Sequence, residues 1–197
     1  RTIWEMGYEF LKLGIEHILI GYDHIAFLIG LLILSHTFWN LLKIVTAFTI
    51  AHSITLICAT LGVVALPYTA PDGSNIIVET LIAVSIAYIA VENLYTKHSN
   101  KRWIIAFAFG LIHGFGFSGV LREMGLPKEG LALSLVSFNV GVEIGQLAIV
   151  SVLFPLLWFW AKKSHRLYDM VIIKGLSIAL FLFGAFLALD RAFFNLV

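Results

Sequence analysis

The chain has little of what a soluble protein or a disulfide-bonded secreted protein needs. Only 13% of its 197 residues are charged, whereas 60% are hydrophobic, and this balance excludes a soluble globular domain of ordinary composition. The lone cysteine, Cys58, excludes a disulfide framework and a thiolate metal cluster. The net charge is +1, and no run of basic side chains is long enough to bind nucleic acid, so we expect no nucleic-acid partner.

Long apolar runs are what the chain has in abundance. Six of them are long enough to cross a bilayer, near 15–35, 41–63, 76–95, 103–121, 131–160 and 171–194. Backbone polar groups in lipid must be hydrogen-bonded within their own segment, which makes these runs helices. We therefore predict an all-α polytopic membrane protein with a single transmembrane domain over 1–197. Six helices form its bundle. Residues 1–14 form an amphipathic segment that is expected on the membrane surface, and the alternative is that they are the start of the first span.

The charges between the apolar runs predict an orientation. Lysine and arginine occur at Lys43, in 97–102 and in 162–166, whereas the proline-rich segment 66–75 has neither. By the positive-inside rule, the basic segments face the cytoplasm and both termini lie outside. The N-terminal segment does not have the pattern of a signal peptide. Either the first span directs insertion, or upstream sequence is missing.

Four ionisable side chains occur at one depth in different spans. Such residues cost at least about 2.5 to 3.5 kcal/mol at the centre of a bilayer, so they persist mainly where they face a cavity or a partner. Counted at 1.5 Å per residue, each lies roughly 12 to 18 Å below the outer boundary. The four residues are His24, His52, His113 and Glu143. The shared level predicts one metal site, and the alternative is scattered hydrogen bonding between helices.

Other polar residues are expected beside this site or at its entrance. In a continuous helix His17 and His24 are about 10 Å apart along the axis, too far to bind one ion together. His17 is therefore expected to guard the entrance, to form a second site or to meet lipid head groups. Asp23 is expected to orient an imidazole, or else to cap a helix or pair with a polar group. The remaining candidates of this kind are Asn139, Gln146, Thr49 and Ser118.

Glycines flank two of the predicted ligands. A small residue at every fourth position lets helix backbones approach closely. If the helix of 103–121 packs against that of 131–160, Glu143 moves toward His113. The alternative is that these glycines only set helix packing. The residues concerned are Gly110, Gly114, Gly141 and Gly145.

Five blocks, in order along the chain, resemble the HupE/UreJ family of membrane proteins. They are 14–24 (GIEHILIGYDH), 48–53 (FTIAHS), 91–93 (VEN), 110–117 (GLIHGFGF) and 138–146 (FNVGVEIGQ). The resemblance covers essentially the whole chain. It implies a multi-pass protein of the bacterial inner membrane, and some members of the family are associated with hydrogenase or urease accessory systems and regarded as nickel permeases.

One position in the first block points to a branch of that family. Ile18 stands where the best-known nickel-linked members have proline. The chain is therefore more similar to a second branch, whose members often follow an extracytoplasmic domain. Besides membrane lipid, the resemblance thus implies an upstream extracytoplasmic domain or a partner subunit.

Two functions use the same predicted ligands. The first is transport of a divalent transition metal, nickel or zinc before others, bound by His24, His52, His113 and Glu143 from the outer side. The second is an intramembrane metal-dependent hydrolase, in which the histidines hold a zinc-like ion with an open position and Glu143 or Asp23 is the general base. A third function is a structural subunit of a membrane complex.

The three functions differ in what should surround the site. Transport needs polar residues that lead inward, and Glu92 and Asn93 are available. A site sealed on its inner side by leucine, isoleucine and phenylalanine favours hydrolysis. Ligands too far apart for any ion favour the structural function.

Overall fold

The structure is a computed structural model that describes residues 2–35, 37–64, 75–96, 101–123 and 130–194. Every regular element within these residues is a helix, which confirms the all-α prediction. Two of them, η1 and η2, are π-helical. The elements are α1 (Ile3–Ile20), α2 (Tyr22–Leu32), α3 (Phe38–Thr60), α4 (Ile76–Tyr95), α5 (Arg102–Gly116), α6 (Ser118–Glu123), α7 (Leu131–Lys163), α8 (His165–Leu167), η1 (Tyr168–Leu176), α9 (Ser177–Leu189) and η2 (Asp190–Phe194).

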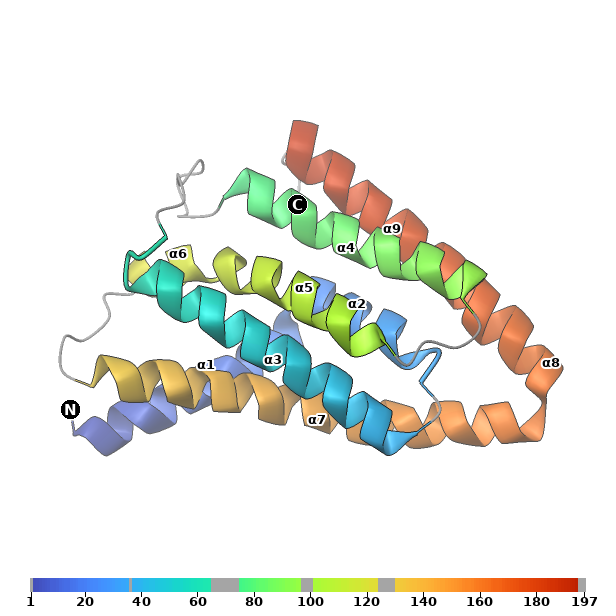
Figure 1. Cartoon of the computed structure of the whole chain (residues 1–197), viewed down its shortest axis with the longest axis horizontal. Helices are drawn as coiled ribbons and strands as arrows, with labels where there is room; N and C mark the ends of the chain where they lie inside the picture. Colours follow the sequence, from blue (N-terminus) through green and yellow to red (C-terminus); the bar gives the residue numbers. More distant parts are fainter. Residues whose placement is uncertain (1, 36, 65–74, 97–100, 124–129, 195–197) are drawn as a thin grey trace.

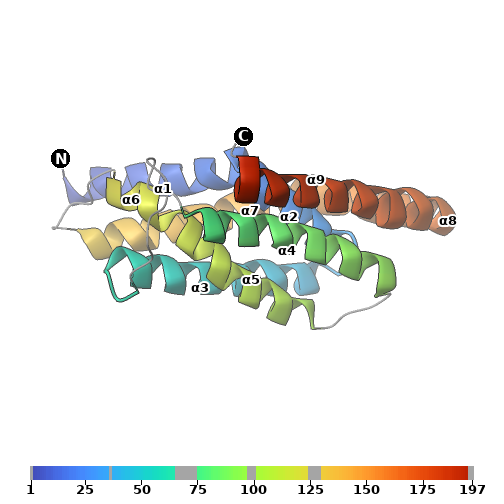
Figure 2. The ribbon, with the colours of Figure 1, turned by 90° about the horizontal axis from the view of Figure 1, so that it is seen from above.

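The long helices run along one common axis (Figures 1 and 2). Three pairs pack most closely, namely α1 with α7, α3 with α5, and α4 with α9. The short helix α2 lies between them and contacts α4, α7 and α9. The buried apolar side chains form three clusters between these helices. The interior of the bundle is thus built from several helices that are distant in sequence.

The number of membrane spans differs from the six predicted. Four helical segments are long and apolar enough to cross a bilayer: α3, α4, α7 and the continuous segment His165–Phe194. The pair α1 and α2 makes a fifth if it is counted as one span, although it is bent by 69°. Helix α5 has only 15 residues. The chain is therefore a multi-pass membrane protein with four or five candidate spans among the described residues.

The first helix includes most of the predicted N-terminal segment. It extends from Ile3 to Ile20 without a break near residue 14. Thr2 begins it with a capping box, in which its hydroxyl accepts from the backbone of Glu5 and the Glu5 carboxylate accepts from the backbone of Thr2. The break comes later, at Gly21. The capping box thus extends this helix toward the N-terminus, and the glycine ends it.

Glycines bring α1 and α7 into backbone contact. A Cβ atom added at Gly14 would overlap the carbonyl of Phe138, and one added at Gly141 would overlap the carbonyl of Leu11. No larger residue fits at either position without separating the helices. The close packing of α1 on α7 therefore depends on these two glycines.

The other glycine pair faces a different helix from the one expected. A Cβ atom at Gly110 would lie 2.6 Å from the carbonyl oxygen of Phe48, and one at Gly114 would overlap the carbonyl of His52. Helix α5 therefore packs on α3, while α7 packs on α1. The expected close pairing of α5 with α7 is wrong. The glycine pair of α5 faces α3, and the glycine pair of α7 faces α1.

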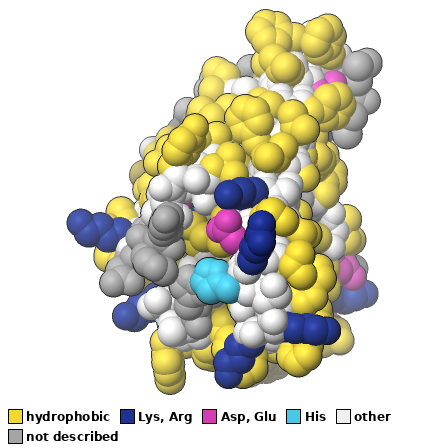
Figure 3. Space-filling view, turned by 90° about the vertical axis from the view of Figure 1, so that its right-hand side faces the viewer, with side chains coloured by type: hydrophobic (Ala, Val, Ile, Leu, Met, Phe, Trp, Pro, Cys, Tyr) yellow, Lys and Arg dark blue, Asp and Glu magenta, His cyan; other side chains and the backbone are white. Residues whose placement is uncertain are grey.

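Lysine and arginine gather at one end of the bundle, which we call the basic end (Figure 3). The chain passes there from α2 to α3, from α4 to α5 and from α7 to α8 (Figure 1). The N-terminus lies at the opposite end (Figure 1). The exposed basic residues that define this end are Lys43, Lys101, Lys162, Lys163 and Arg166. Such a one-sided distribution is the pattern that the positive-inside rule describes.

Candidate metal centre

The break between α1 and α2 brings two histidines together. Gly21 caps the end of α1 and the beginning of α2. A Cβ atom there would lie 2.7 Å from the carbonyl oxygen of His17 and 3.0 Å from Nδ1 of His24, so the position needs glycine. The ring centroids of the two histidines are 4.6 Å apart. The separation of about 10 Å predicted from an α-helical rise is wrong, because the helix is not continuous.

Four imidazoles meet in the interior, and we call them the histidine cluster: His17, His24, His52 and His113. The first three offer nitrogen atoms that all lie within 4.8 Å of one another. The ring of His113 lies 5.0 Å from that of His24. His52 and His113 are fully buried, and His24 is 8% exposed. They come from α1, α2, α3 and α5, so the cluster joins four helices.

The Nε2 atom of each cluster histidine is buried without a hydrogen-bond partner among the described residues. A buried polar atom left unpaired costs about 1 to 3 kcal/mol, and native proteins contain few of them. Four such atoms in one place are a strong departure from that rule. The cluster therefore has the properties of a binding site whose ligand interacts with Nε2.

The opposite ring nitrogen of three cluster histidines is already engaged. Each Nδ1 faces an oxygen acceptor, and this places the proton on Nδ1 and the lone pair on Nε2. Metal-binding histidines usually have such a partner, which orients the ring. The pairs are His24 with the Asp23 carboxylate at 3.0 Å, His52 with the Asn139 side-chain oxygen at 3.3 Å, and His113 with the Phe109 carbonyl at 2.9 Å.

Asp23 connects the cluster to the C-terminal helix. Its Oδ1 atom accepts from the backbone N–H of His24 at 2.9 Å as well as from the ring. Its Oδ2 atom lies 3.2 Å from Nη2 of Arg191, and Nη1 of that arginine donates to the carbonyl of Glu79 at 3.0 Å. Asp23 therefore both orients an imidazole and pairs with another helix, the two alternatives predicted for it.

Arg191 is a residue that the sequence analysis missed. It is 8% exposed and lies in η2, at the end of the last apolar segment. The available signal was an arginine beside Asp190 in an otherwise apolar stretch. Arginine and lysine inside such segments are rare and almost always have a partner. That rule could have linked Arg191 to an intramembrane carboxylate such as Asp23.

The structure does not bring Glu143 into the group of nitrogen atoms that lie within 4.8 Å. Its Oε1 atom accepts from the hydroxyl of Thr46 at 2.9 Å, and it lines a groove between α3 and α7. Thr49 donates to Gln146 at 2.8 Å, and Ser118 donates to a backbone carbonyl three residues earlier. Of the predicted neighbours, Asp23 and Asn139 are the two that hydrogen-bond cluster histidines.

Phenylalanine rings enclose the cluster. They remove water from the site, and charges and dipoles interact more strongly there as a result. The centroid distances are 4.1 Å from Phe117 to His17, 5.0 Å from Phe27 to His113, 5.1 Å from Phe48 to His113 and 6.4 Å from Phe138 to His52. The result is a polar centre inside an aromatic shell.

Comparison with known proteins agrees with the motif blocks. The model that describes HupE/UreJ proteins matches residues 1–191. The chain belongs to the HupE/UreJ family. A search of curated proteins and a search of solved structures each found no match. The matched residues include the whole histidine cluster as well as Asp23 and Arg191.

On the side of the basic end, this HupE/UreJ protein has a second buried polar group. Arg102 is 1% exposed, donates to the carbonyl of Leu31 at 3.0 Å and pairs with Glu92 at 3.0 Å. It also donates to Asn93, which in turn donates to the carbonyl of Gly30 at 2.9 Å. The polar residues expected on the inner path are therefore bound to Arg102 and to the last carbonyls of α2.

Proposed function

We propose that this HupE/UreJ protein binds a divalent transition-metal ion at the histidine cluster and carries it across the membrane. The observation that carries the proposal is the set of four buried Nε2 atoms without partners among the described residues. Neutral imidazoles suit Ni²⁺, Co²⁺, Cu²⁺ and Zn²⁺, whereas Mg²⁺ prefers oxygen ligands. Some members of the HupE/UreJ family are regarded as nickel permeases, and the membership of this chain in the family supports the same class of ion.

His17, His24 and His52 are the ligands that the geometry favours. Bonds of about 2.0 to 2.1 Å to one ion place imidazole nitrogens roughly 3.3 Å apart in a tetrahedral site. Nitrogens that already lie within 4.8 Å reach that arrangement by small ring movements. His113 lies outside this group of three, with its ring centroid 5.0 Å from that of His24. The Asp23 carboxylate, one hydrogen bond from His24, offsets part of the charge of the ion.

The break in the α1–α2 pair supports transport. Interrupted helices form the central binding sites of many transporters, because the free backbone groups at the break hold the substrate while the surrounding helices rock to open the site to either side in turn. The histidine cluster lies at the break after Gly21. With the basic end at the cytoplasm, as the positive-inside rule predicts, the ion enters from the opposite side and leaves past Phe27, Phe48 and the Arg102 network.

The second candidate function is a metal-dependent hydrolase. One observation favours it, since Phe27 and Phe48 are 2% exposed and close the centre toward the basic end. The hydrolase predicted from the sequence uses Glu143 or Asp23 as the general base that accepts the proton of the metal-bound water. Asp23 has both oxygens engaged, by His24 and Arg191, and Glu143 lies outside the cluster. Transport is therefore the function that the geometry supports better.

Metal content and metal uptake test the proposal separately. The purified protein and its His24→Ala, His52→Ala and His165→Ala variants are incubated with Ni²⁺, dialysed and analysed for nickel. We expect about one ion per chain for the wild type and for His165→Ala, an exposed residue outside the cluster, and far less for the other two variants. Equal nickel in all four proteins would refute metal binding.

Vesicles containing the protein then distinguish the two metal functions. We expect ⁶³Ni²⁺ to accumulate inside vesicles that contain the wild type and to stay outside those with His52→Ala. Metal binding without accumulation would refute transport and favour the hydrolase.

A further inference from the structure

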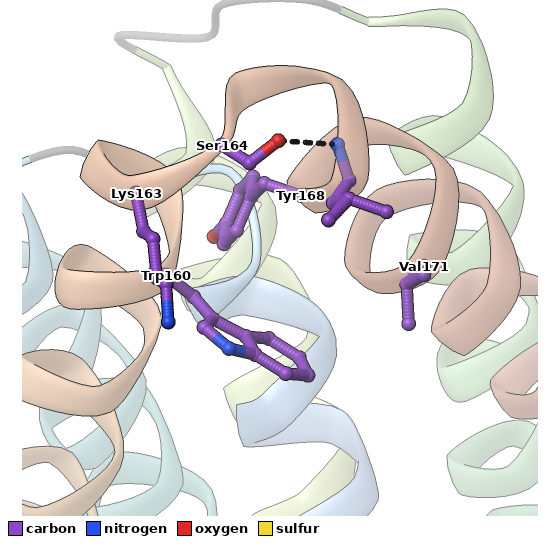
Figure 4. A pocket seen from close by; sticks show the side chains of 6 residues that line it. Trp160, Lys163, Ser164, Tyr168 and Val171 are labelled. Atoms are coloured by element: carbon purple, nitrogen blue, oxygen red, sulfur yellow. Dashed lines mark hydrogen bonds between the residues drawn. The ribbon is translucent and has the colours of Figure 1, made fainter.

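The end of α7 and the beginning of η1 enclose a cavity far from the histidine cluster. Its volume is about 320 Å³. Trp160 and Lys163, on α7, face Tyr168 and Val171, on η1, across this space (Figure 4). The residues that line it lie on both sides of the turn from α7 into α8, and that turn is at the basic end (Figure 1). Its lining residues are Trp160, Lys163, Ser164, Leu167, Tyr168 and Val171.

The polar groups of two lining residues are occupied by the fold. The hydroxyl of Ser164 accepts from the backbone N–H of Leu167 at 3.4 Å and caps the turn. The hydroxyl of Tyr168 donates to the carbonyl of Ile33 at 2.8 Å, which ties η1 to the end of α2. These bonds hold the walls of the cavity in place. They also leave the ammonium group of Lys163 as the charged group that the cavity offers to a ligand.

Three cations lie at the cavity or beside it. Lys162, Lys163 and Arg166 are exposed, and none of them forms an ion pair with a carboxylate of the described residues. The next carboxylate along the chain, Asp169, is already paired with Lys174 at 3.3 Å. The site therefore has an excess of positive charge and fits an anionic ligand.

The walls next to these cations are apolar and aromatic. Leu167 and Val171 are 58% and 48% exposed, and Trp160 is 51% exposed. Trp158 lies outside the lining, 3.8 Å from the ammonium group of Lys162. Tryptophan is enriched where a membrane protein crosses the head-group region. Basic pockets between helices at that level bind the head groups of anionic lipids. A ligand that fits both the cations and the apolar walls has an anionic head and a hydrocarbon tail.

We propose that this cavity binds one anionic phospholipid. The phosphate lies against Lys163, with Arg166 as the next cation. An acyl chain follows Leu167 and Val171 along η1. The bound lipid fixes the turn between α7 and η1. The last helical segment, which carries Arg191, can then move only together with α7. The existence of this site does not depend on the proposed metal function.

Native mass spectrometry of the detergent-purified protein tests the site. Phosphatidylglycerol and phosphatidylcholine with the same acyl chains are added in turn, and the bound fraction is measured as a function of lipid concentration. We expect the wild type to retain phosphatidylglycerol in preference to phosphatidylcholine. Lys163→Gln and Arg166→Gln are each expected to lower the affinity for phosphatidylglycerol about fivefold. The reason is that one cation near the membrane surface raises the affinity for anionic lipid by about this factor.

Two further variants separate the cavity from general basic charge. Val171→Trp fills the cavity and keeps every cation, and we expect it to lose phosphatidylglycerol as well. Lys43→Gln removes an exposed cation of the basic end that does not line this cavity, and we expect no change. Circular dichroism shows whether each variant keeps its helix content. If Val171→Trp does not fold, the comparison of Lys163→Gln with Lys43→Gln decides the result.

Three outcomes would overturn the proposal. One is equal retention of both lipids by the wild type, because then no anionic head group is recognised. Another is an equal loss of phosphatidylglycerol in Lys43→Gln and Lys163→Gln, which would mean a diffuse basic surface. The last is a folded Val171→Trp variant with unchanged affinity, because then the cavity is not the site.

Discussion

Replacing Asp23 by asparagine tests whether this carboxylate holds His24 in its metal-binding orientation. In the wild type, one oxygen accepts from the His24 ring and backbone while the other faces Arg191. Asparagine has a single oxygen, so its NH₂ group must face one of these donors. Either the imidazole or the guanidinium then loses its acceptor. We expect metal affinity to fall as a result, although His24 itself is unchanged.

The size of the effect follows from the position of Asp23 one bond away from a ligand. Outer partners of metal-binding histidines typically contribute about 10 to 100-fold to affinity, which corresponds to about 1.4 to 2.7 kcal/mol. Arg191→Gln keeps the carboxylate but removes its cation, and we expect a smaller loss, about threefold to tenfold. If Arg191 acts through Asp23, the double variant should bind metal no more weakly than Asp23→Asn alone.

Titration with Co²⁺ in competition with a chelator gives the affinities, and the visible spectrum of bound Co²⁺ reports its ligands. Asp169→Asn is the matched control, because Asp169 also pairs with a cation, Lys174 at 3.3 Å, but lies in η1, away from the cluster. We expect it to leave Co²⁺ affinity unchanged. An Asp23→Asn variant that binds within twofold of the wild type would refute the reasoning. Losses that add in the double variant would refute the path from Arg191 through Asp23.

Three further predictions concern packing and the break between α1 and α2. Gly14→Val should destabilise the protein by about 1 to 3 kcal/mol or more, because the new side chain overlaps the Phe138 carbonyl; thermal unfolding should show little change for Gly175→Ala, whose Cβ would meet its nearest atom at 3.5 Å. Arg102→Gln should lower stability by about 3 to 5 kcal/mol, since it leaves Glu92 buried without its cation; an unchanged melting temperature would contradict this. Gly21→Ala should weaken Co²⁺ binding about tenfold or more through its clash near His24, while circular dichroism stays constant; unchanged Co²⁺ affinity would show that the break tolerates a side chain.

The helical class and the depth of the histidines were predictable from the chain alone. Depth in a membrane helix depends on residue count, because each residue rises by about 1.5 Å wherever the helix packs. His24, His52 and His113 could therefore be placed at one level, and the structure brings their rings into one cluster. Glu143 shares that level, yet its side chain hydrogen-bonds Thr46 in the groove between α3 and α7.

The direction of each side chain around its helix axis, and the helix against which each helix packs, could not be predicted from residue counts. Gly110 and Gly114 indicate close packing, but every helix offers an apolar surface in lipid, so the spacing does not say which helix is met. The break at Gly21 interrupts an apolar run whose residues favour a continuous helix, and directly after it Asp23 and His24 contact Arg191 and His113 on other helices.

The amino-acid sequence by itself determined that this is a helical membrane protein of the HupE/UreJ family with histidines at one depth, because composition, motif order and helical rise are properties of the chain. Only the tertiary structure decided that His17 belongs with the other three histidines, that Glu143 does not, and that Arg191 supports Asp23. These contacts join residues that are far apart in sequence, so they depend on how several helices pack together.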